Sequence, residues 1–335
     1  MPDALVAIGW NDDVAAAVVA AHRPDAVPGR VTRVDRGVVT VLTDAGSVRA
    51  TRGEVLPATG DWVLLDGDDE PAVVEVLPRR SAFVRGDPMD GAARDAQVVA
   101  SNIDTVFVTQ SIEKGAKVRR LERELVLAFE SGAEPVVVLT KADLVPGELD
   151  LGEVEASAAD VPVIVTSAVT GLGIDDLRAY IGPGRTVALV GASGVGKSTL
   201  VNALVGEDVR ATGAVRTTDQ RGRHTTTARE LVLLPSGGVL VDTPGLRAVT
   251  LWLSDEGFRR AFADVEALAG DCRFHDCAHD REPGCAVQAA VGRGDLDEAR
   301  VAHYRELDAE LDRVAIRDAE RERAERAGRR PRRAR

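Results

Sequence analysis

One octapeptide of the 335-residue sequence constrains the fold more than any other feature. Residues Gly191 to Ser198 read GASGVGKS and match the pattern G-x-x-x-x-G-K-[ST], with the apolar run TVALV before them and the helical TLVNALVG after them. A glycine-rich loop between a buried strand and a helix can wrap its backbone N–H groups around a phosphate. Lys197 can then reach the outer phosphates, and the Ser198 hydroxyl can bind Mg²⁺. The sequence therefore predicts a nucleoside triphosphate site.

The segments around this loop alternate between strand and helix patterns. The runs IDTVFVTQ, VVVLT and VPVIVTS are typical of buried strands, and the segment 118–129 places Leu121, Leu125 and Phe129 on one helical face. Such alternation predicts an α/β domain with a mostly parallel sheet, whose ligands bind at the carboxyl ends of the strands.

Downstream of the loop, the apolar run VLVDTPG ends in Asp242 and then Gly245. An Asp at the end of a buried strand can hold Mg²⁺ through water, and the glycine N–H can bind a γ-phosphate. A plain strand-to-turn exit is the alternative, which the upstream phosphate loop disfavours. The polar loop RTTDQRGRHTTTARE lies between them, and one of its threonines can complete the Mg²⁺ shell. We expect Thr226 to be this Mg²⁺ ligand, and Thr225 and Thr227 are the alternatives.

A second motif, Thr140-Lys141-Ala142-Asp143, follows the apolar run VVVL about fifty residues before the phosphate loop. The Asp143 carboxylate can accept two hydrogen bonds from guanine N1–H and its 2-amino group, a pair that adenine does not offer. The Lys141 stem would pack along the base, and a backbone amide near Ser167-Ala168 could reach the guanine oxygen.

The predicted nucleotide-binding residues come from four segments of the chain. They are Thr140, Lys141, Ala142, Asp143, Ser167, Ala168, Gly191, Ala192, Ser193, Gly194, Val195, Gly196, Lys197, Ser198, Thr199, Asp242 and Gly245. Of these, we expect Ser198 and Asp242, with Thr226, to hold Mg²⁺ directly or through water.

Short β-rich runs separated by turn signals fill the stretch from Arg30 to about Arg85. They predict a small antiparallel barrel of the oligonucleotide-binding kind. The barrel either binds RNA or only packs against its neighbour. The predicted division is an N-terminal segment 1–29, the barrel 30–88, the α/β domain 96–250 and a C-terminal helical domain 251–335.

All three cysteines of the chain lie in the pattern C-x4-C-x-H-x5-C formed by Cys272, Cys277, His279 and Cys285. Three thiolates and one imidazole make a closed tetrahedral shell suited to structural Zn²⁺. His275 is a rival ligand. A helical pattern follows and ends in the Arg-rich tail 329–335, which is either solvated or in contact with RNA.

The formal net charge of −12 excludes a uniformly basic protein, so contacts with nucleic acid must come from local patches. The N-terminus has no basic start, and Asp12 and Asp13 interrupt its apolar stretches, so we expect neither a secretory signal nor a membrane span. Three clustered cysteines fit a reducing compartment, and a cytoplasmic location is expected.

The motifs at 140–143, 167–168, 191–198 and 242–245 are those of GTPases in rotated order. With a barrel before them and a Cys/His cluster after them, the chain resembles the ribosome small-subunit-dependent GTPase A family of circularly permuted GTPases. The resemblance implies a monomeric GTP hydrolase that binds the rRNA of the small ribosomal subunit late in its assembly. It further implies that the subunit stimulates hydrolysis and that the protein leaves afterwards.

Two positions depart from common GTPase patterns. Thr140 stands where the family motif commonly begins with Asn, and its hydroxyl can still form one hydrogen bond. Leu246 stands where many GTPases place a water-orienting Gln, a feature shared with the family, so another group must orient the attacking water. His224 in the threonine loop is the candidate, and a solvated histidine without a role is the alternative.

Three rival functions stay open at this level. The chain could be a GTP-gated RNA-binding switch with negligible turnover, a permuted GTPase that serves the large subunit, or an ATPase. Measured hydrolysis, binding to each subunit and competition between guanine and adenine nucleotides distinguish them.

Overall fold

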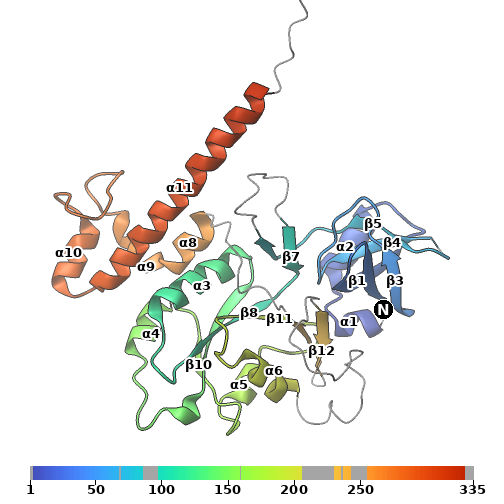
Figure 1. Cartoon of the computed structure of the whole chain (residues 1–335), viewed down its shortest axis with the longest axis horizontal. Coiled ribbons are helices and arrows are strands. Elements are labelled where there is room, and N and C mark those ends of the chain that lie inside the picture. The colour runs from blue at the N-terminus through green and yellow to red at the C-terminus, as the bar shows by residue number, and fades with distance from the viewer. Residues whose placement is uncertain are drawn as a thin grey trace, which may run out of the picture.

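The computed structural model describes residues 3–67, 69–85, 97–158, 160–205, 230–234, 237–242 and 255–328. Figure 1 shows three parts in chain order: a small β barrel, a central α/β domain and a group of C-terminal helices. The predicted domain boundaries stay a prediction, since the parts share strands and buried contacts.

Five strands form the closed barrel. They are β1 (Val27–Val34), β2 (Val38–Thr43), β3 (Gly46–Thr51), β4 (Trp62–Asp66) and β5 (Ala72–Val76). The pairings β1–β2, β2–β3, β3–β5, β5–β4 and β4–β1 close the ring. Alternate residues of β2 point inward, and Val39 and Val41 are fully buried beside Val31 and Val63. The predicted oligonucleotide-binding type of barrel is confirmed.

Two short helices, α1 (Asp3–Ala7) and α2 (Asp12–Ala20), precede the barrel. The Asn11 side chain caps α2 by accepting a hydrogen bond from Val14 N at 3.0 Å. Leu5 and Ile8 are 1% exposed and belong to the main apolar core. The N-terminal segment is therefore an integral part of the packed structure.

The buried Arg30 ties these helices, the barrel and the α/β domain together. Its guanidinium donates to Gly60 O at 3.2 Å, to Asn102 O at 2.9 Å and to Ile8 O. Because burial outweighs the attraction of nearby carboxylates, the pKa of Arg30 falls from 12.5 to about 10, which still leaves the group charged at neutral pH. Carbonyl oxygens from three segments thus converge on one cation.

Among its described residues, the α/β domain has six strands and four helices. They are β8 (Thr105–Ser111), α3 (Val118–Glu130), β9 (Glu134–Thr140), α4 (Gly152–Ser157), β10 (Val163–Val165), α5 (Ile174–Arg178), β11 (Thr186–Val190), α6 (Lys197–Val205), β12 (Glu230–Leu233) and β13 (Val239–Asp242). The strand order is β10-β9-β8-β11-β13-β12, and only β12 runs antiparallel to its neighbour. The predicted mostly parallel sheet is confirmed.

The barrel and the α/β domain share one continuous sheet. Strand β12 pairs antiparallel with β1 at Arg33 and Glu230, which joins the two parts into eleven strands. A separate two-stranded sheet, β6 (Ala82–Arg85) with β7 (Gln97–Ser101), lies in the connection between them. The sequence indicated neither pairing.

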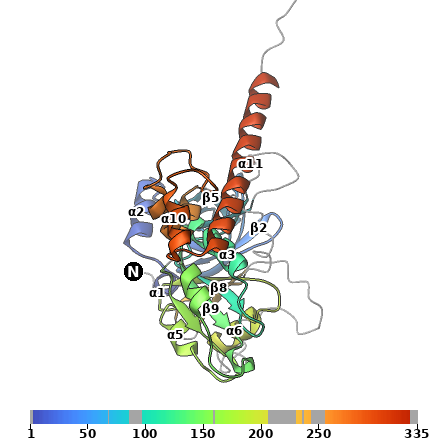
Figure 2. The same cartoon turned by 90° about the vertical axis from the view of Figure 1, so that its left-hand side faces the viewer.

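The described residues of the C-terminal part, 255–328, form four helices: α8 (Asp255–Ala261), α9 (Ala263–Ala269), α10 (Ala286–Arg293) and α11 (Glu298–Gly328). Helix α8 packs closely on α3, because a Cβ at Gly257 would lie 2.8 Å from Val126 O and from Glu130 N. Helix α11 projects away from the body in both views (Figures 1 and 2). Across the described ranges, no helix is both long enough and apolar enough to cross a membrane.

Candidate nucleotide-binding site

The phosphate loop joins β11 to the first turn of α6 at the carboxyl edge of the sheet. Gly191 and Gly196 adopt φ values of +141° and +104°, and a side chain at Gly191 would collide with the Thr109 carbonyl oxygen. The Lys197 ammonium donates to Gly191 O and Ala192 O, each at 2.6 Å. The loop therefore has the left-handed turns and the central cation that a bound polyphosphate requires.

The base-binding motif lies at the end of the neighbouring strand β9. Lys141 adopts the left-handed conformation with φ +63°, and the 3-10 turn η2 (Ala142–Leu144) follows. The exposed Asp143 accepts a hydrogen bond from Ser167 Oγ at 2.6 Å, which links the two segments predicted to hold guanine. Since a carboxylate has about four lone-pair sites, Asp143 can accept guanine's two donors as well. The Lys141 ammonium pairs with Glu113 at 3.1 Å.

The second segment, Ser167-Ala168, follows the short strand β10. Ser167 is fully buried, and its oxygen accepts hydrogen bonds from Val169 N at 3.3 Å and Thr170 N at 3.1 Å. These bonds fix the turn after Ala168 beside the Asp143 carboxylate.

Thr140 connects the base-binding motif directly to the phosphate loop. Its hydroxyl oxygen lies within hydrogen-bond distance of Val195 O in the phosphate loop and 3.1 Å from Gln110 O. A hydroxyl carries one hydrogen, so the Thr140 donor is shared between two carbonyls. Thr140 is 5% exposed, so water does not replace the missing donor easily.

Two further residues beneath the loop were not predicted from the sequence. Gln110, at the end of β8, donates from Nε2 to Glu124 on α3 at 2.5 Å. Burial raises the pKa of Glu124 to about 7, against the opposite effects of the Gln110 hydrogen bond and of the cations Arg120 and Lys197. The end of the predicted strand 103–110 could have placed Gln110 near the carboxyl edge of the sheet, but no local signal pairs it with Glu124.

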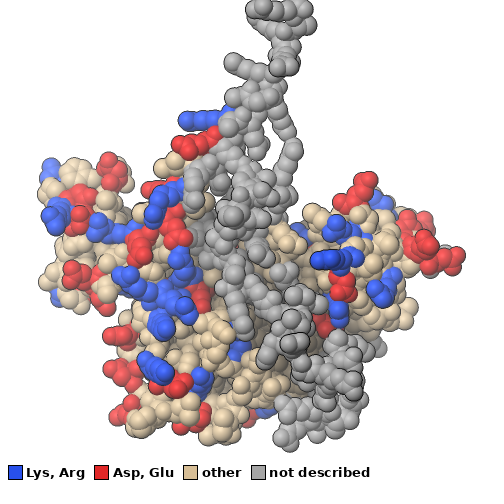
Figure 3. Space-filling model, in the orientation of Figure 1, with Lys and Arg blue, Asp and Glu red and all other residues tan. Residues whose placement is uncertain are grey.

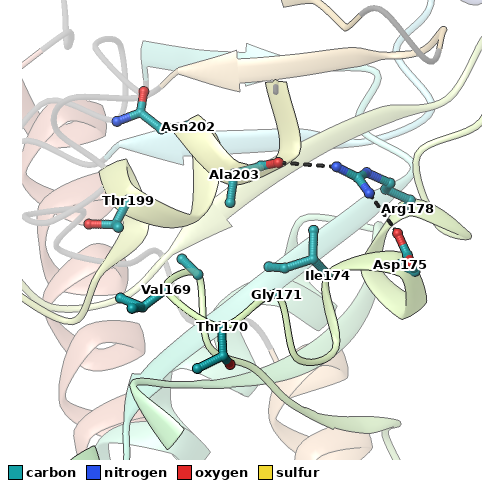
Figure 4. Close-up of a pocket in the computed structure, with 10 residues that line it drawn as sticks. Val169, Thr170, Gly171, Ile174, Asp175, Arg178, Thr199, Asn202 and Ala203 are labelled. Carbon is teal, nitrogen blue, oxygen red and sulfur yellow. Dashed lines mark hydrogen bonds and ion pairs between the residues drawn. The ribbon is translucent and has the colours of Figure 1, made fainter. Parts of the chain in front are cut away.

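An open cleft of about 610 Å³ adjoins the site. Figure 4 shows Thr199, Asn202 and Ala203 of α6 on one side and the 169–178 segment on the other. Arg178 closes one end by donating to Ala203 O at 3.2 Å and pairing with Asp175 at 2.6 Å. Because Ala168 and Thr199 both line it, the cleft extends from the base side of the predicted nucleotide site.

The remaining predicted ligands lie at the end of β13 and beyond. Asp242 is the last residue of β13, which runs parallel to β11 and so ends beside the phosphate loop. Gly245, Leu246, His224 and Thr226, with the neighbouring threonines, fall outside the described residues, as does the Arg-rich tail.

The structure brings the four predicted metal ligands of the C-terminal part together. The donor atoms of Cys272, Cys277, His279 and Cys285 all lie within 4.8 Å of one another. The Cys272 and Cys285 sulfurs are 3.9 Å apart, and His279 Nδ1 lies 3.6 Å and 3.5 Å from them. Zinc bonds of about 2.3 Å to sulfur and about 2.0 Å to nitrogen would give tetrahedral edges of about 3.8 Å and about 3.5 Å. The donor set therefore fits Zn²⁺, and His275 is not part of it.

Backbone donors surround the sulfurs of this cluster. The Ala286 N–H donates to the Cys272 sulfur and the Gln288 N–H to the Cys285 sulfur, both at 3.4 Å, at the start of α10. Burial acts to raise the pKa of Cys272, but the N–H groups of Ala286 and Val287 and the neighbouring thiols hold it below its ordinary value. His279 adopts φ +53°, and its carbonyl accepts from Gln288 Nε2 at 2.7 Å. The hydrogen bonds from backbone N–H groups to the sulfurs favour thiolates, the form of cysteine that a metal binds.

The strand order, the phosphate loop and the base-binding motif upstream of it define a circularly permuted P-loop GTPase. The sequence profile of the RsgA GTPase family matches residues 76–252 of the chain, slightly more than half of it. The chain belongs to the RsgA GTPase family, whose members hydrolyse GTP.

Individual relatives agree with this assignment. The chain is 47% identical over 333 residues to a Streptomyces avermitilis protein named small ribosomal subunit biogenesis GTPase RsgA, with 96% of this chain and 89% of that protein covered. The crystal structure of YjeQ from Thermotoga maritima is 28% identical, with a TM-score of 0.63 over 85% of this chain and 98% of that one. YloQ, described as a circularly permuted GTPase, shares the fold at 23% identity, with a TM-score of 0.61 over 88% and 97% of the two chains.

Proposed function

We propose that this GTPase acts in the late maturation of the small ribosomal subunit, binds the subunit's rRNA, and leaves after subunit-stimulated hydrolysis. Two kinds of support converge on this proposal. The Streptomyces relative is named for small-subunit biogenesis. The chain also carries a barrel of the oligonucleotide-binding type and a Cys/His cluster, two kinds of module that commonly bind RNA.

The pairing of β12 with β1 is the observation that carries the proposal. Strand β12 begins at Glu230, directly after the threonine loop that is predicted to contact the γ-phosphate, and Glu230 pairs with Arg33 of the barrel. A movement at the end of this loop would therefore be passed to strand β1 of the barrel through the pairing of Glu230 with Arg33. This arrangement would couple the state of the nucleotide to a candidate RNA-binding surface.

Within the nucleotide site we assign separate roles to three groups of residues. Asp143 selects guanine, with the Lys141 stem against the base and the Ser167-Ala168 turn at the guanine oxygen. The phosphate loop and Lys197 hold the phosphates. Ser198, Asp242 and Thr226 would hold Mg²⁺, and this ion would supply positive charge beside the phosphates. His224 is our candidate for orienting the attacking water, since Leu246 cannot do so.

We assign Zn²⁺ to Cys272, Cys277, His279 and Cys285 as a structural ion. It would fix the 272–285 loop and the start of α10, because ligands from both ends of the loop meet at one point. Elemental analysis of the purified protein should find one zinc per chain. A Cys277→Ser variant that retains full zinc would contradict the assignment.

Co-sedimentation with purified ribosomal subunits tests the partner. The protein should pellet with small subunits in the presence of a non-hydrolysable GTP analogue and much less with GDP, and it should not pellet with large subunits. Preferential binding to large subunits would replace the proposal with the large-subunit alternative. Equal competition by ATP and GTP would remove the role of Asp143.

A further inference from the structure

One phenylalanine of this protein is exposed where all the others are buried. The chain has six phenylalanines, and five of them, Phe83, Phe107, Phe129, Phe258 and Phe262, are at most 9% exposed. Phe274 is 40% exposed and lies outside the described apolar core clusters. Full burial of a phenylalanine side chain stabilises a fold by about 1.5–3 kcal/mol. Since Phe274 is partly exposed, it contributes less to stability than a buried phenylalanine would.

The Cys/His loop holds Phe274 in a defined place. The residue lies between Cys272 and Cys277, two of the four clustered donors. The backbone N–H of its neighbour Arg273 donates to Gly284 O at 3.1 Å, and Gly284 adopts φ +83°. A Cβ at Gly284 would lie 3.1 Å from Arg273 Cβ, so the glycine makes room for this side chain. The backbone that carries Phe274 is therefore held in place by a hydrogen bond and by close packing.

Arg273 and Phe274 form a pair that combines a planar cation with an aromatic ring. The Arg273 guanidinium carbon lies 5.4 Å from the centre of the Phe274 ring. Arg273, Phe274 and His275 are consecutive and all exposed. Aromatic rings and guanidinium planes are the two groups on which proteins commonly stack unpaired RNA bases.

The surrounding charges argue for contact with a base rather than with a phosphate. Asp271 and Asp276 flank the pair and are exposed, so the local charge is not strongly positive. On the face shown in Figure 3, cations and carboxylates are likewise interspersed. A phosphate would be repelled by these carboxylates, whereas the face of a nucleobase carries no net charge.

We propose that Phe274, supported by Arg273, is a stacking platform for an unpaired base of the RNA that this GTPase binds. The inference rests on the proposed function, because it requires an RNA partner. Stacking of one base is lost with the ring, so we expect Phe274→Ala to weaken binding on the order of tenfold to a hundredfold.

Binding of the full-length protein to purified small subunits, titrated by filter binding at several salt concentrations, tests the inference. The variants are Phe274→Ala, Phe274→Leu and Phe274→Tyr. Leucine keeps an apolar side chain but removes the aromatic face, and tyrosine keeps that face. Val19→Ala is the matched control, since Val19 is 77% exposed on α2 of the N-terminal segment. Zinc content and GTP affinity, measured without subunits, show whether each variant is folded.

Stacking predicts that Phe274→Tyr and Val19→Ala bind like the wild type, while Phe274→Ala and Phe274→Leu both bind more weakly. The slope of log affinity against log salt should be the same for all variants, because no phosphate contact is lost. Wild-type binding by Phe274→Leu would indicate an apolar contact with protein and overturn the inference, as would wild-type binding by Phe274→Ala. Failure of the wild type itself to bind would remove the proposed function, and this inference with it.

Discussion

Thr140 shows how one atypical residue can keep the role of a motif. Its hydroxyl contacts the carbonyls of Val195 and Gln110, which belong to the phosphate loop and to β8. The residue therefore holds three segments of the site together, although it has one donor for two acceptors. An asparagine amide has two N–H donors and could satisfy both carbonyls.

Substitutions at Thr140 change the number of hydrogen-bond donors at this point. Thr140→Asn should bind GTP as tightly as the wild type or up to about tenfold more tightly, since one added hydrogen bond contributes about 0.5–1.5 kcal/mol. Thr140→Val, which keeps the shape and removes the donor, should weaken binding on the order of tenfold. Equilibrium titration with a fluorescent GTP analogue measures both. A marked loss in Thr140→Asn would mean that the motif has been misplaced.

Glu124 leads to a prediction about pH. Its pKa rises from 4.5 to about 7 because the carboxyl is buried, so the folded state holds a proton that the unfolded state has lost. The resulting destabilisation is absent below about pH 4.5, grows with pH and is complete above about pH 7, where it reaches about 3 kcal/mol.

Glu124→Gln should remove this penalty, because the amide oxygen can still accept from Gln110 but cannot ionise. The variant should therefore match the wild type near pH 4.5 and be more stable by up to about 3 kcal/mol at pH 8. Urea denaturation at several pH values gives the difference in the free energy of unfolding. A difference that does not change with pH would show that Glu124 has an ordinary pKa.

The residues predicted to contact nucleotide have a clearer signal in the sequence than the residues that support them. Asp143, Lys197 and Ser198 belong to motifs in which chemistry fixes both residue type and spacing. Gln110 and Glu124 have no such signature, because their roles arise from the folded packing of β8 against α3.

At the scale of elements, α3 links the GTPase domain to the C-terminal helices. Its Glu122 is 1% exposed and accepts a hydrogen bond from Arg300 at 2.8 Å, and it also contacts His303 Nδ1. Arg300 in turn donates to Asp264 on α9 at 2.6 Å and 2.7 Å. Arg119, one turn earlier on α3, pairs with Glu306 at 3.0 Å on the surface.

The buried and exposed pairs on α3 should differ sharply in their effect on stability. Glu122→Ala leaves the buried Arg300 and His303 without this partner and should cost about 3–5 kcal/mol. Arg119→Ala should change the free energy of unfolding by less than about 1 kcal/mol, since Arg119 and Glu306 are 64% and 60% exposed. Chemical denaturation of both variants compares them. Equal losses would contradict the assignment of the interface to Glu122.

The spacing of apolar residues predicted helix α3 but not the helices that pack against it. Leu121, Leu125 and Phe129 predicted a helix over 118–129, and α3 spans Val118–Glu130. The burial of Glu122 on the same helix could not be predicted, because Arg300 lies 178 positions away in the sequence. The helices α1 and α2 were not predicted either, although Asn11 before an alanine-rich run is a usable capping signal.

At the scale of the whole molecule, buried charged groups and a strand pairing join the three parts. Arg30 ties the barrel to the N-terminal helices and to the start of the α/β domain, and β12 pairs with β1. Glu122 holds the C-terminal helices on α3. In the sequence, circular permutation places the motif 242–245 shortly before the C-terminal helices, while β12 pairs with β1 of the barrel.

Hydrolysis of GTP by the full-length protein, measured with and without purified small ribosomal subunits, tests whether the subunit stimulates this GTPase. We expect slow turnover by the protein alone, clear stimulation by small subunits and no stimulation by large subunits, because Leu246 cannot orient the attacking water and the partner must help. A rate that small subunits leave unchanged would contradict subunit-stimulated hydrolysis and leave a GTP-gated binding switch as the better description.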